Sequence, residues 1–445
     1  MKRIYSVIAL WIGCCWGGMA QTPVYLDETK PVDERIEDAL SRMTLEEKIA
    51  MCHAQSKFST PGCPRLGIPE IWMSDGPHGV RMEHVWDDWV HADWTNDSCT
   101  AYPALSCLAA TFNPELAYRY GYALGEEARF RKKDIILGPG VNIYRTPLSG
   151  RNFEYMGEDP YLTGEMAVPY IQELQKNGVA ACVKHFALNN QEKWRDNVNV
   201  KVSDRALYEI YLPAFKRAVQ EGKAWSVMGA YNRVWDEHCC HNARLLNDIL
   251  RGEWGFDGAV VSDWGATHDT KQAALNGLDI EMGSYTDGLA TESMYGYDAF
   301  YLATPYLETI KRGEIPESTV DDKARNILRL IFRTTMNPNR PYGSFGTEEH
   351  ALAGRKIAQE GIVLLKNAKN TLPIELSGTK RIAVIGENAV KRMTVGGGSS
   401  SLKAKYEVSP LEGIRRFVGE QAEITYARGY ESPAVKEQDV KDAKE

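Results

Sequence analysis

The sequence contains no long basic run, and acidic residues outnumber basic ones. It has 52 Lys and Arg against 60 Asp and Glu, which gives a net charge of −8. Nucleic acids and anionic membrane surfaces attract strongly basic proteins. No segment after residue 20 is long and apolar enough to cross a bilayer. We therefore expect no nucleic-acid partner and no membrane insertion once the N-terminal segment has been removed.

The sequence also lacks the signatures of a metal or nucleotide site. No CxxC pair stands near a His pair, and His53, His78, His238 and His241 show no spacing typical of metal ligands. The glycine-rich stretch "VGGGSSS" at 395–401 is not followed by the Lys-Ser/Thr pair of a phosphate-binding loop. These absences predict a protein without a metal or cofactor.

The N-terminus has the pattern of a secretory signal peptide. "MKR" is basic, "IYSVIALWIGCCWGG" is apolar, and "GMA" before Gln21 provides small residues for cleavage. We predict a signal peptide over residues 1–20 and export to the periplasm or the extracellular space. Cys14 or Cys15 could instead be a lipoprotein cysteine, although Trp11 is a poor residue at that place and favours simple export.

Few cysteines remain after this cleavage. Of the nine in the sequence, those at 52, 63, 99, 107, 182, 239 and 240 would stay in the mature chain. In an oxidising compartment the pairs 52/63 and 99/107 are close enough in sequence to form disulfides. The odd count leaves at least one thiol free.

What the chain does have is enough apolar material for more than one domain. It contains 445 residues, of which 43% are hydrophobic. Residues 31–57 show helical periodicity, with Thr44 as a helix N-cap. Beyond them, apolar runs that resemble strands alternate with amphipathic helical stretches; the runs are 68–76, 134–142, 179–186, 225–232, 258–265 and 277–283. Such alternation predicts an α/β fold in which residues 21–335 form a (β/α)8-type barrel.

Polar residues follow these runs at their C-terminal ends. The endings are Asp75, Asn142, Lys184-His185, Tyr231-Asn232, Asp263-Trp264 and Glu281. In a barrel of parallel strands these ends meet at one mouth, where active sites lie. Strand capping explains a few such residues, but a polar ending on every run indicates a shared site.

The repeating pattern stops in a segment rich in Pro, Gly and Asn. We predict a linker over 336–350, followed by the first part of a second α/β domain over 351–445. In it "AGRKIAQEGIVLLKN" reads as a helix that continues into a strand, and "KRIAVIGENA" and "AEITYARGY" each supply a further strand. These strands are too few for a whole sheet, so we expect an incomplete α/β sandwich.

The residues expected at the mouth suit a neutral sugar. Carboxylates and cations can bind hydroxyl groups in pairs, and the Trp264 ring can cover the apolar face of a pyranose. A carboxylate held below the anomeric carbon acts as a nucleophile in retaining glycosidases. Asp263 fits this role. We expect nearby cations to keep it ionised, and Tyr231 to steady it through a hydrogen bond.

Five segments together resemble glycoside hydrolase family 3, the β-glucosidases and β-xylosidases. They are "SDGPHGVR", "GRNFEYMGEDPYL", "KHFALNNQE", "MGAYN" and "FDGAVVSDWGA", in the order found in the family. The resemblance covers roughly residues 30–445 and implies that Asp263 is the catalytic nucleophile. It further implies a sugar subsite made of Asp75, Arg151, Lys184, His185, Arg195, Met228, Tyr231 and Trp264, with Ser399 reaching it from the second domain. Met228 could equally serve in packing, and Arg195 could be a solvated helix charge.

The family's usual acid/base is a glutamate deep in the second domain, which here would lie beyond Glu445. We therefore assign no acid/base residue. One branch of the family, the β-N-acetylglucosaminidases, takes a histidine from a loop of the first domain instead. Its "KHFPGHGD"-like loop is replaced here by "KHFALNNQE".

The sequence thus predicts an exported, exo-acting, retaining β-glucosidase that hydrolyses terminal β-D-glucosyl residues of oligosaccharides. A β-xylosidase, with or without α-L-arabinofuranosidase activity, is the alternative within the family. A sugar-binding fragment impaired in catalysis, because it lacks the acid/base, is the alternative from another class.

Overall fold

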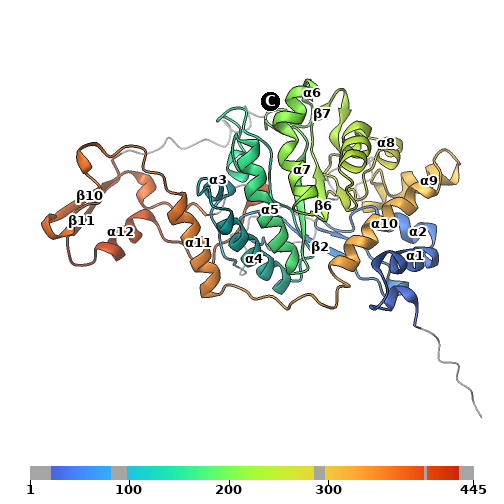
Figure 1. Cartoon of the computed structure of the whole chain (residues 1–445), viewed down its shortest axis with the longest axis horizontal. Helices are drawn as coiled ribbons and strands as arrows, with labels where there is room; N and C mark the ends of the chain where they lie inside the picture. Colours follow the sequence, from blue (N-terminus) through green and yellow to red (C-terminus); the bar gives the residue numbers. More distant parts are fainter. Residues whose placement is uncertain (1–21, 82–97, 285–295, 395–397, 430–445) are drawn as a thin grey trace, which may run out of the picture.

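The structure is a computed structural model that describes residues 22–81, 98–284, 296–394 and 398–429. The predicted signal peptide and the last 16 residues lie outside the described ranges (Figure 1). Within these ranges no helix is long and apolar enough to cross a membrane.

The first part of the chain is built around one curled sheet. Its strands pair in the order β1-β2-β3-β4-β6-β9, and all neighbours are parallel except β1 and β2. Single bridges continue from Val261 to Ile280 and from Glu281 to His53, close to the start of β1. The strands are β1 (Ser59–Thr60), β2 (Ile71–Ser74), β3 (Ile135–Ile136), β4 (Ala180–Phe186), β6 (Ser226–Gly229) and β9 (Ala259–Val261).

The (β/α)8-type fold class is therefore confirmed, with two differences in detail. The first strand pair is antiparallel, because β1 and β2 are joined by a short connection with one 3-10 turn, Pro64–Leu66, instead of an α-helix. The predicted run 277–283 takes part in the sheet only through the bridges of Ile280 and Glu281.

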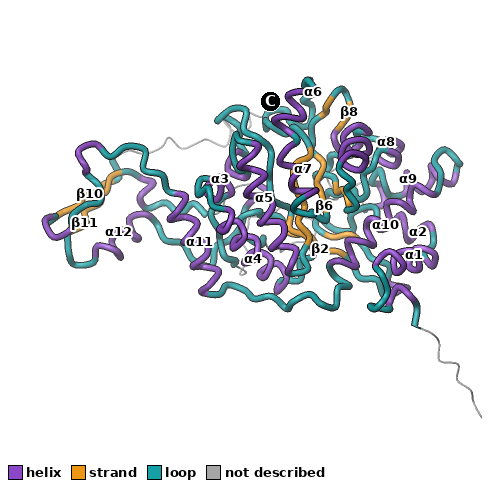
Figure 2. Tube along the Cα trace, viewed as in Figure 1, coloured by secondary structure: helices purple, strands orange, loops and turns teal. Residues whose placement is uncertain are grey.

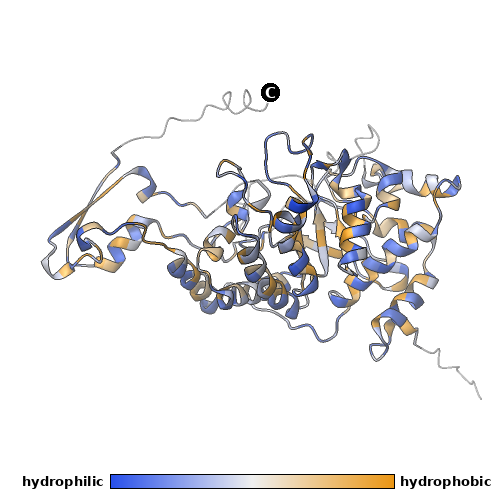
Figure 3. Ribbon diagram, turned by 45° about the horizontal axis from the view of Figure 1, so that its top comes forward, coloured by the Kyte–Doolittle hydropathy of each residue, from blue (hydrophilic) through white to orange (hydrophobic). Residues whose placement is uncertain are grey.

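Helices surround this sheet on its outer side (Figure 2). Because both faces of the strands are covered, β2, β3, β4, β6 and β9 read as nearly continuous apolar runs, and almost every residue in them is buried. In Figure 3 the strands at the centre of the barrel are coloured mostly as hydrophobic. The α-helices of this part are α1 (Val32–Arg42), α2 (Leu45–Met51), α3 (Leu105–Ala109), α4 (Pro114–Phe130), α5 (Pro160–Lys176), α6 (Asp204–Ala206), α7 (Pro213–Gln220), α8 (Thr270–Leu275), α9 (Thr304–Lys311) and α10 (Ser318–Arg333). Two π-helical segments, Leu207–Tyr211 and Arg244–Glu253, also belong to it.

The predicted helix over 31–57 is divided in two. Thr44 is the N-cap of α2, as predicted: its hydroxyl accepts the backbone N–H of Glu47, whose carboxylate accepts the backbone N–H of Thr44. Such a capping box starts a new helix, and the chain turns between α1 and α2 for this reason. A small three-stranded sheet lies outside the barrel sheet and contains β5 (Asn199–Val200), β7 (Arg233–Val234) and β8 (Glu237–His238).

The second segment begins after an irregular stretch that follows α10. Helix α11 (Glu348–Gly361) packs against α3 and α4, and two parallel strands, β10 (Arg381–Ile385) and β11 (Glu423–Ala427), lie farther from the barrel with α12 (Pro410–Val418) beside them (Figure 1). The prediction of a strand directly after α11 is wrong. Residues 362–367 form no strand, and Ile362 and Leu365 are 78% and 92% exposed.

The seven cysteines of the described residues are all free thiols, so neither candidate disulfide is present. Cys52 and Cys63 are both buried, and burial raises the pKa of each thiol. These cysteines behave as small core residues.

Candidate active site

All ten residues predicted for the site line a single cavity of about 750 Å³. They are Asp75, Arg151, Lys184, His185, Arg195, Met228, Tyr231, Asp263, Trp264 and Ser399. The cavity lies at the mouth of the barrel, where the carboxyl ends of the parallel strands converge. Arg81, Phe153, Glu154, Glu192 and Asp196 also line it and were not predicted.

The strands place most of these side chains directly. Asp75 directly follows β2, and Asp263 comes two residues after β9. Lys184 and His185 lie near the C-terminal end of β4. Arg151 arrives from the long loop after β3, at the start of the short 3-10 helix Asn152–Glu154. Polar groups gathered at the ends of the strands are the arrangement that the sequence pattern indicated.

Asp263 is buried and only partly satisfied. Its Oδ1 accepts the backbone N–H of Trp264 at 2.9 Å, whereas its Oδ2 has no hydrogen-bond partner among the described residues. Burial raises the pKa of Asp263 to about 6, although Arg151, Lys184 and Arg195 lower it. The prediction that cations keep this carboxyl ionised is thus correct in direction, but burial outweighs them.

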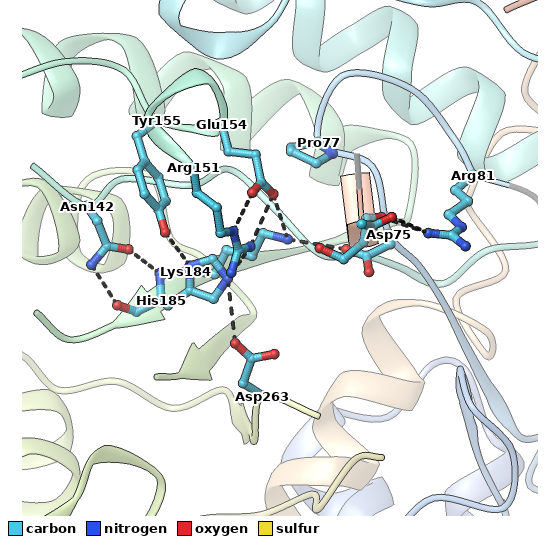
Figure 4. Close-up of polar contacts among 12 residues, drawn as sticks. Asp75, Pro77, Arg81, Asn142, Arg151, Glu154, Tyr155, Lys184, His185 and Asp263 are labelled. Atoms are coloured by element: carbon cyan, nitrogen blue, oxygen red, sulfur yellow. Dashed lines mark hydrogen bonds and ion pairs between the residues drawn. The ribbon is translucent and has the colours of Figure 1, made fainter. Parts of the chain in front are cut away.

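Arg151 and Lys184 are held by carboxylates that surround them (Figure 4). The Arg151 Nε donates to Glu154 Oε2 at 2.6 Å, and its Nη2 donates to Glu154 Oε1 at 3.3 Å. The Lys184 ammonium lies 3.3 Å from Asp75 Oδ1 and 3.6 Å from Glu154 Oε1. Two cations and two carboxylates therefore form one buried network.

His185 is neutral, and its tautomer follows from its neighbours. Burial, Arg151 and Lys184 hold its pKa well below the usual range. Because a guanidinium can only donate, the Arg151 Nη2 must donate to His185 Nε2, 2.9 Å away. The Nδ1–H then donates to the Tyr155 hydroxyl oxygen, also at 2.9 Å. The 3.7 Å approach of Nε2 to Asp263 Oδ2 is consequently not an ion pair.

Aromatic groups also line the mouth. The Arg195 guanidinium lies 4.3 Å from the ring centre of Tyr231 and pairs with Glu192 at 2.9 Å. Burial raises the pKa of Tyr231, and the Asp263 carboxylate raises it further through its charge and through a side-chain hydrogen bond, as expected from the sequence. The Trp264 indole donates to the carbonyl oxygen of Lys57 at 2.6 Å, which fixes the plane of the ring. A fixed ring beside the carboxylate suits the stacking of a sugar face.

The second segment reaches the mouth through the loop that contains Ser399. Arg81 is almost fully buried, and its Nη1 donates to the carbonyl oxygens of Gly398 and Ser399 at 3.0 and 3.1 Å. Cys99 and Lys403 continue this attachment with a backbone hydrogen bond of 2.9 Å. The predicted contribution of Ser399 to the site therefore depends on Arg81.

Sequence reasoning missed Glu154 and Arg81, although both lie within segments that it singled out. Glu154 stands three residues after Arg151, a spacing that predicts an ion pair when the segment turns as a helix. Arg81 gave no signal, because its hydrogen bonds to Gly398 and Ser399 join it to backbone oxygens more than 300 residues away in the chain. In the described ranges no group of three or more His, Cys, Asp or Glu could hold a metal ion.

Comparison with known protein families gives two matches. Residues 47–330 match the glycosyl hydrolase family 3 N terminal domain, and residues 362–445 match the family's C-terminal domain. The chain belongs to glycosyl hydrolase family 3. It is thereby placed among the glycoside hydrolases, as the resemblance of its motifs implied.

Two relatives in the family are informative. The chain is 62% identical to "Beta-glucosidase BoGH3A" of Bacteroides ovatus over 417 residues, which are 93% of this chain and 56% of that protein. A crystal structure of the β-glucosidase of Kluyveromyces marxianus in complex with glucose superposes with a TM-score of 0.79 at 36% identity, over 89% of this chain and 46% of that one. The chain thus spans about half the length of these family 3 proteins.

Proposed function

We propose that the chain carries the sugar-binding half of a retaining, exo-acting β-glucosidase, with Asp263 as its nucleophile. The observation that carries this proposal is the Oδ2 atom of Asp263, which lines the cavity and has no hydrogen-bond partner among the described residues. A nucleophile needs such a free oxygen, and with a pKa of about 6 the carboxyl is mostly ionised at pH 7. The glucose complexes of family 3 neighbours support glucose as the sugar.

In the proposed reaction the β-glucoside binds with its pyranose against Trp264. Asp263 Oδ2 attacks the anomeric carbon, the bond to the leaving oxygen breaks, and an ester to Asp263 forms. The electron pair of the broken bond goes to the leaving oxygen, so that an activated aglycone departs as its anion. Water then hydrolyses this ester and releases β-glucose. Asp75, Arg151 and Lys184 bind the hydroxyl groups around the ring.

None of the other carboxylates at the mouth is proposed as the acid/base. Asp75 and Glu154 pair with Lys184, and Glu192 and Asp196 lie 2.9 and 3.8 Å from Arg195. A general acid must be free to point its proton at the leaving oxygen, whereas these carboxylates are directed at cations of the site. For Glu154 the cations lower the pKa to about 2 despite burial.

A glucoside with a good leaving group tests the nucleophile without an acid. The chain is incubated with 2,4-dinitrophenyl 2-deoxy-2-fluoro-β-glucoside, and its intact mass is measured. We expect the mass of one fluoroglucosyl group to be added to the wild type and not to Asp263→Asn. A folded wild-type chain that gains no such mass would contradict the proposal.

Preference for glucoside over xyloside is tested with the paired 2,4-dinitrophenyl glycosides. We expect a higher kcat/KM for the glucoside, and equal values would remove the preference for glucose over the β-xyloside alternative.

We further infer export from the N-terminal pattern of residues 1–20. Recovery of a periplasmic or secreted chain that begins at Gln21 supports it, and a cytoplasmic chain that keeps Met1 contradicts it.

A further inference from the structure

Glu154 is a buried carboxylate at the mouth with no role in the reaction described above. It ends the 3-10 helix Asn152–Glu154, is 2% exposed and lines the cavity. Ionised carboxylates are almost never buried without partners, because leaving water costs them much free energy. The burial of Glu154 is therefore explained by the cations with which it pairs.

Both oxygens of Glu154 are occupied by cations of the site. They bind the Arg151 guanidinium on two of its nitrogens, Nε and Nη2, and Oε1 also lies 3.6 Å from the Lys184 ammonium. This contact is visible at the top of Figure 4, on the side of Arg151 away from Asp263. Glu154 thus directs both of its oxygens at these cations, and it sets the direction of two groups that can bind a sugar.

These two cations have another anion within reach. Arg151 and Lys184 are close enough to lower the pKa of Asp263, yet no ion pair joins either of them to its carboxylate in the described structure. A cation released from Glu154 would find in Asp263 Oδ2 an acceptor without a hydrogen bond. Paired in that way, the oxygen could no longer attack a sugar.

We infer that Glu154 is a positioning residue that holds Arg151 and Lys184 away from Asp263, so that the nucleophile stays free and the remaining N–H groups of both cations face the sugar. In agreement with this, the Nη1 of Arg151 has no partner among the described residues. The inference rests on the proposed function, because it assumes that a sugar occupies this cavity.

The test compares Glu154→Gln with the wild type by the rate of labelling with 2,4-dinitrophenyl 2-deoxy-2-fluoro-β-glucoside across pH. We expect labelling about 10²-fold slower, since misplacement of groups by about 1 Å costs that much. In the wild type the labelling rate should fall at low pH as Asp263 becomes protonated, and we call this fall the acid limb. In Glu154→Gln we expect the acid limb to move to lower pH, because Asp263 gains cations and loses an anion nearby. The other charged or titratable groups near Asp263 are Arg151, Lys184, Arg195, neutral His185, the hydroxyls of Tyr155 and Tyr231, and the thiols of Cys182 and Cys240.

Two further variants make the result specific. Glu154→Asp keeps the negative charge, so we expect it to keep the acid limb of the wild type and to lose only part of the labelling rate. If Glu154→Gln does not fold, Glu154→Asp is the variant that is compared with the wild type. Glu173→Gln is the matched control, since Glu173 is also 2% exposed and paired, with Lys176, but lies on α5 away from the cavity. It should leave the rate and the acid limb unchanged.

Labelling of Glu154→Gln at the wild-type rate, or slower labelling with an unmoved acid limb, would overturn the inference. Glucose binding, followed by calorimetry, separates this result from failure of the proposed function. A wild-type chain that binds glucose but is not labelled contradicts the proposed nucleophile only, and equal glucose affinity in Glu154→Gln would then overturn the inference. A folded chain that does neither overturns both.

Discussion

The barrel and the second segment use similar apolar strands but bury them differently. In β4, β6 and β9 every residue is buried, whereas β10 and β11 alternate between exposed and half-buried positions. Ile135 of β3 is fully buried and Ile385 of β10 is 69% exposed. A strand is buried only as far as other layers cover it, and the described residues provide two covered faces in the barrel alone.

The two regions also contribute unequally to the site. The barrel makes its own core and holds nine of the ten predicted site residues at the ends of its strands and in its loops. The second segment contributes Ser399 through a loop that is tied to the barrel by Arg81. The predictions below test whether the regions are as unequal in stability and chemistry as their burial indicates.

The largest effect is expected for chemistry that belongs to the barrel alone. Asp263→Asn should lower the rate of 2,4-dinitrophenyl β-glucoside cleavage by about 10⁴-fold or more, as is typical when a group that forms the covalent intermediate is lost. Stopped assays with the wild type as reference measure this rate. Ser399→Ala is the matched change in the second segment, and a comparable loss there would contradict the division.

The next effect is on folding stability. Ile135→Ala removes a fully buried side chain and should lower the free energy of unfolding by about 2–5 kcal/mol. Ile385→Ala removes the same atoms from a mostly exposed position and should change it by less than about 0.5 kcal/mol. Urea unfolding followed by circular dichroism measures both. Similar losses would mean that β10 is covered in solution.

The buried carboxyl at the end of the β9 segment should make stability depend on pH. The pKa of Asp263 rises from an ordinary 3.8 to about 6 on folding, so its protonated form is favoured in the folded chain. Its contribution is fully present below pH 4 and is lost as pH rises through 6, by about 3 kcal/mol in total.

The difference in unfolding free energy between Asp263→Asn and the wild type isolates this contribution. It should grow in favour of the Asn variant between pH 4 and 6 and then level off. Over the same range the labelling rate of the wild type should rise as Asp263 ionises. A flat difference across this range would show that the cations cancel the effect of burial.

The smallest effect is expected at the attachment of the two regions. Arg81→Ala removes both hydrogen bonds to the loop at Gly398 and Ser399, and we expect glucose to bind about tenfold more weakly because one wall of the cavity loosens. Calorimetry measures this affinity. Arg205→Ala, on an exposed arginine paired with Glu209, should leave it unchanged. Unaltered binding in Arg81→Ala would mean that the loop makes no contact with the sugar.

Much of the site was accessible from sequence because parallel strands bring their ends together wherever they occur. That rule is enough to gather Asp75, Lys184, His185 and Asp263 without any knowledge of packing. The prediction of a strand after α11 was wrong because local sequence cannot show whether a partner strand is present. The stretch "IVLLK" is apolar enough for a strand, but a strand forms only when another lies beside it.

By itself the sequence determined the α/β class, the barrel mouth and the identity of the groups that meet there, since these follow from local periodicity and from the order of the motifs. Only the tertiary structure decided which charges pair. Arg151 pairs with Glu154, Lys184 pairs with both Asp75 and Glu154, and Asp263 keeps a free oxygen and a raised pKa. Pairing and burial depend on distances between residues far apart in the chain, and no local pattern encodes those distances.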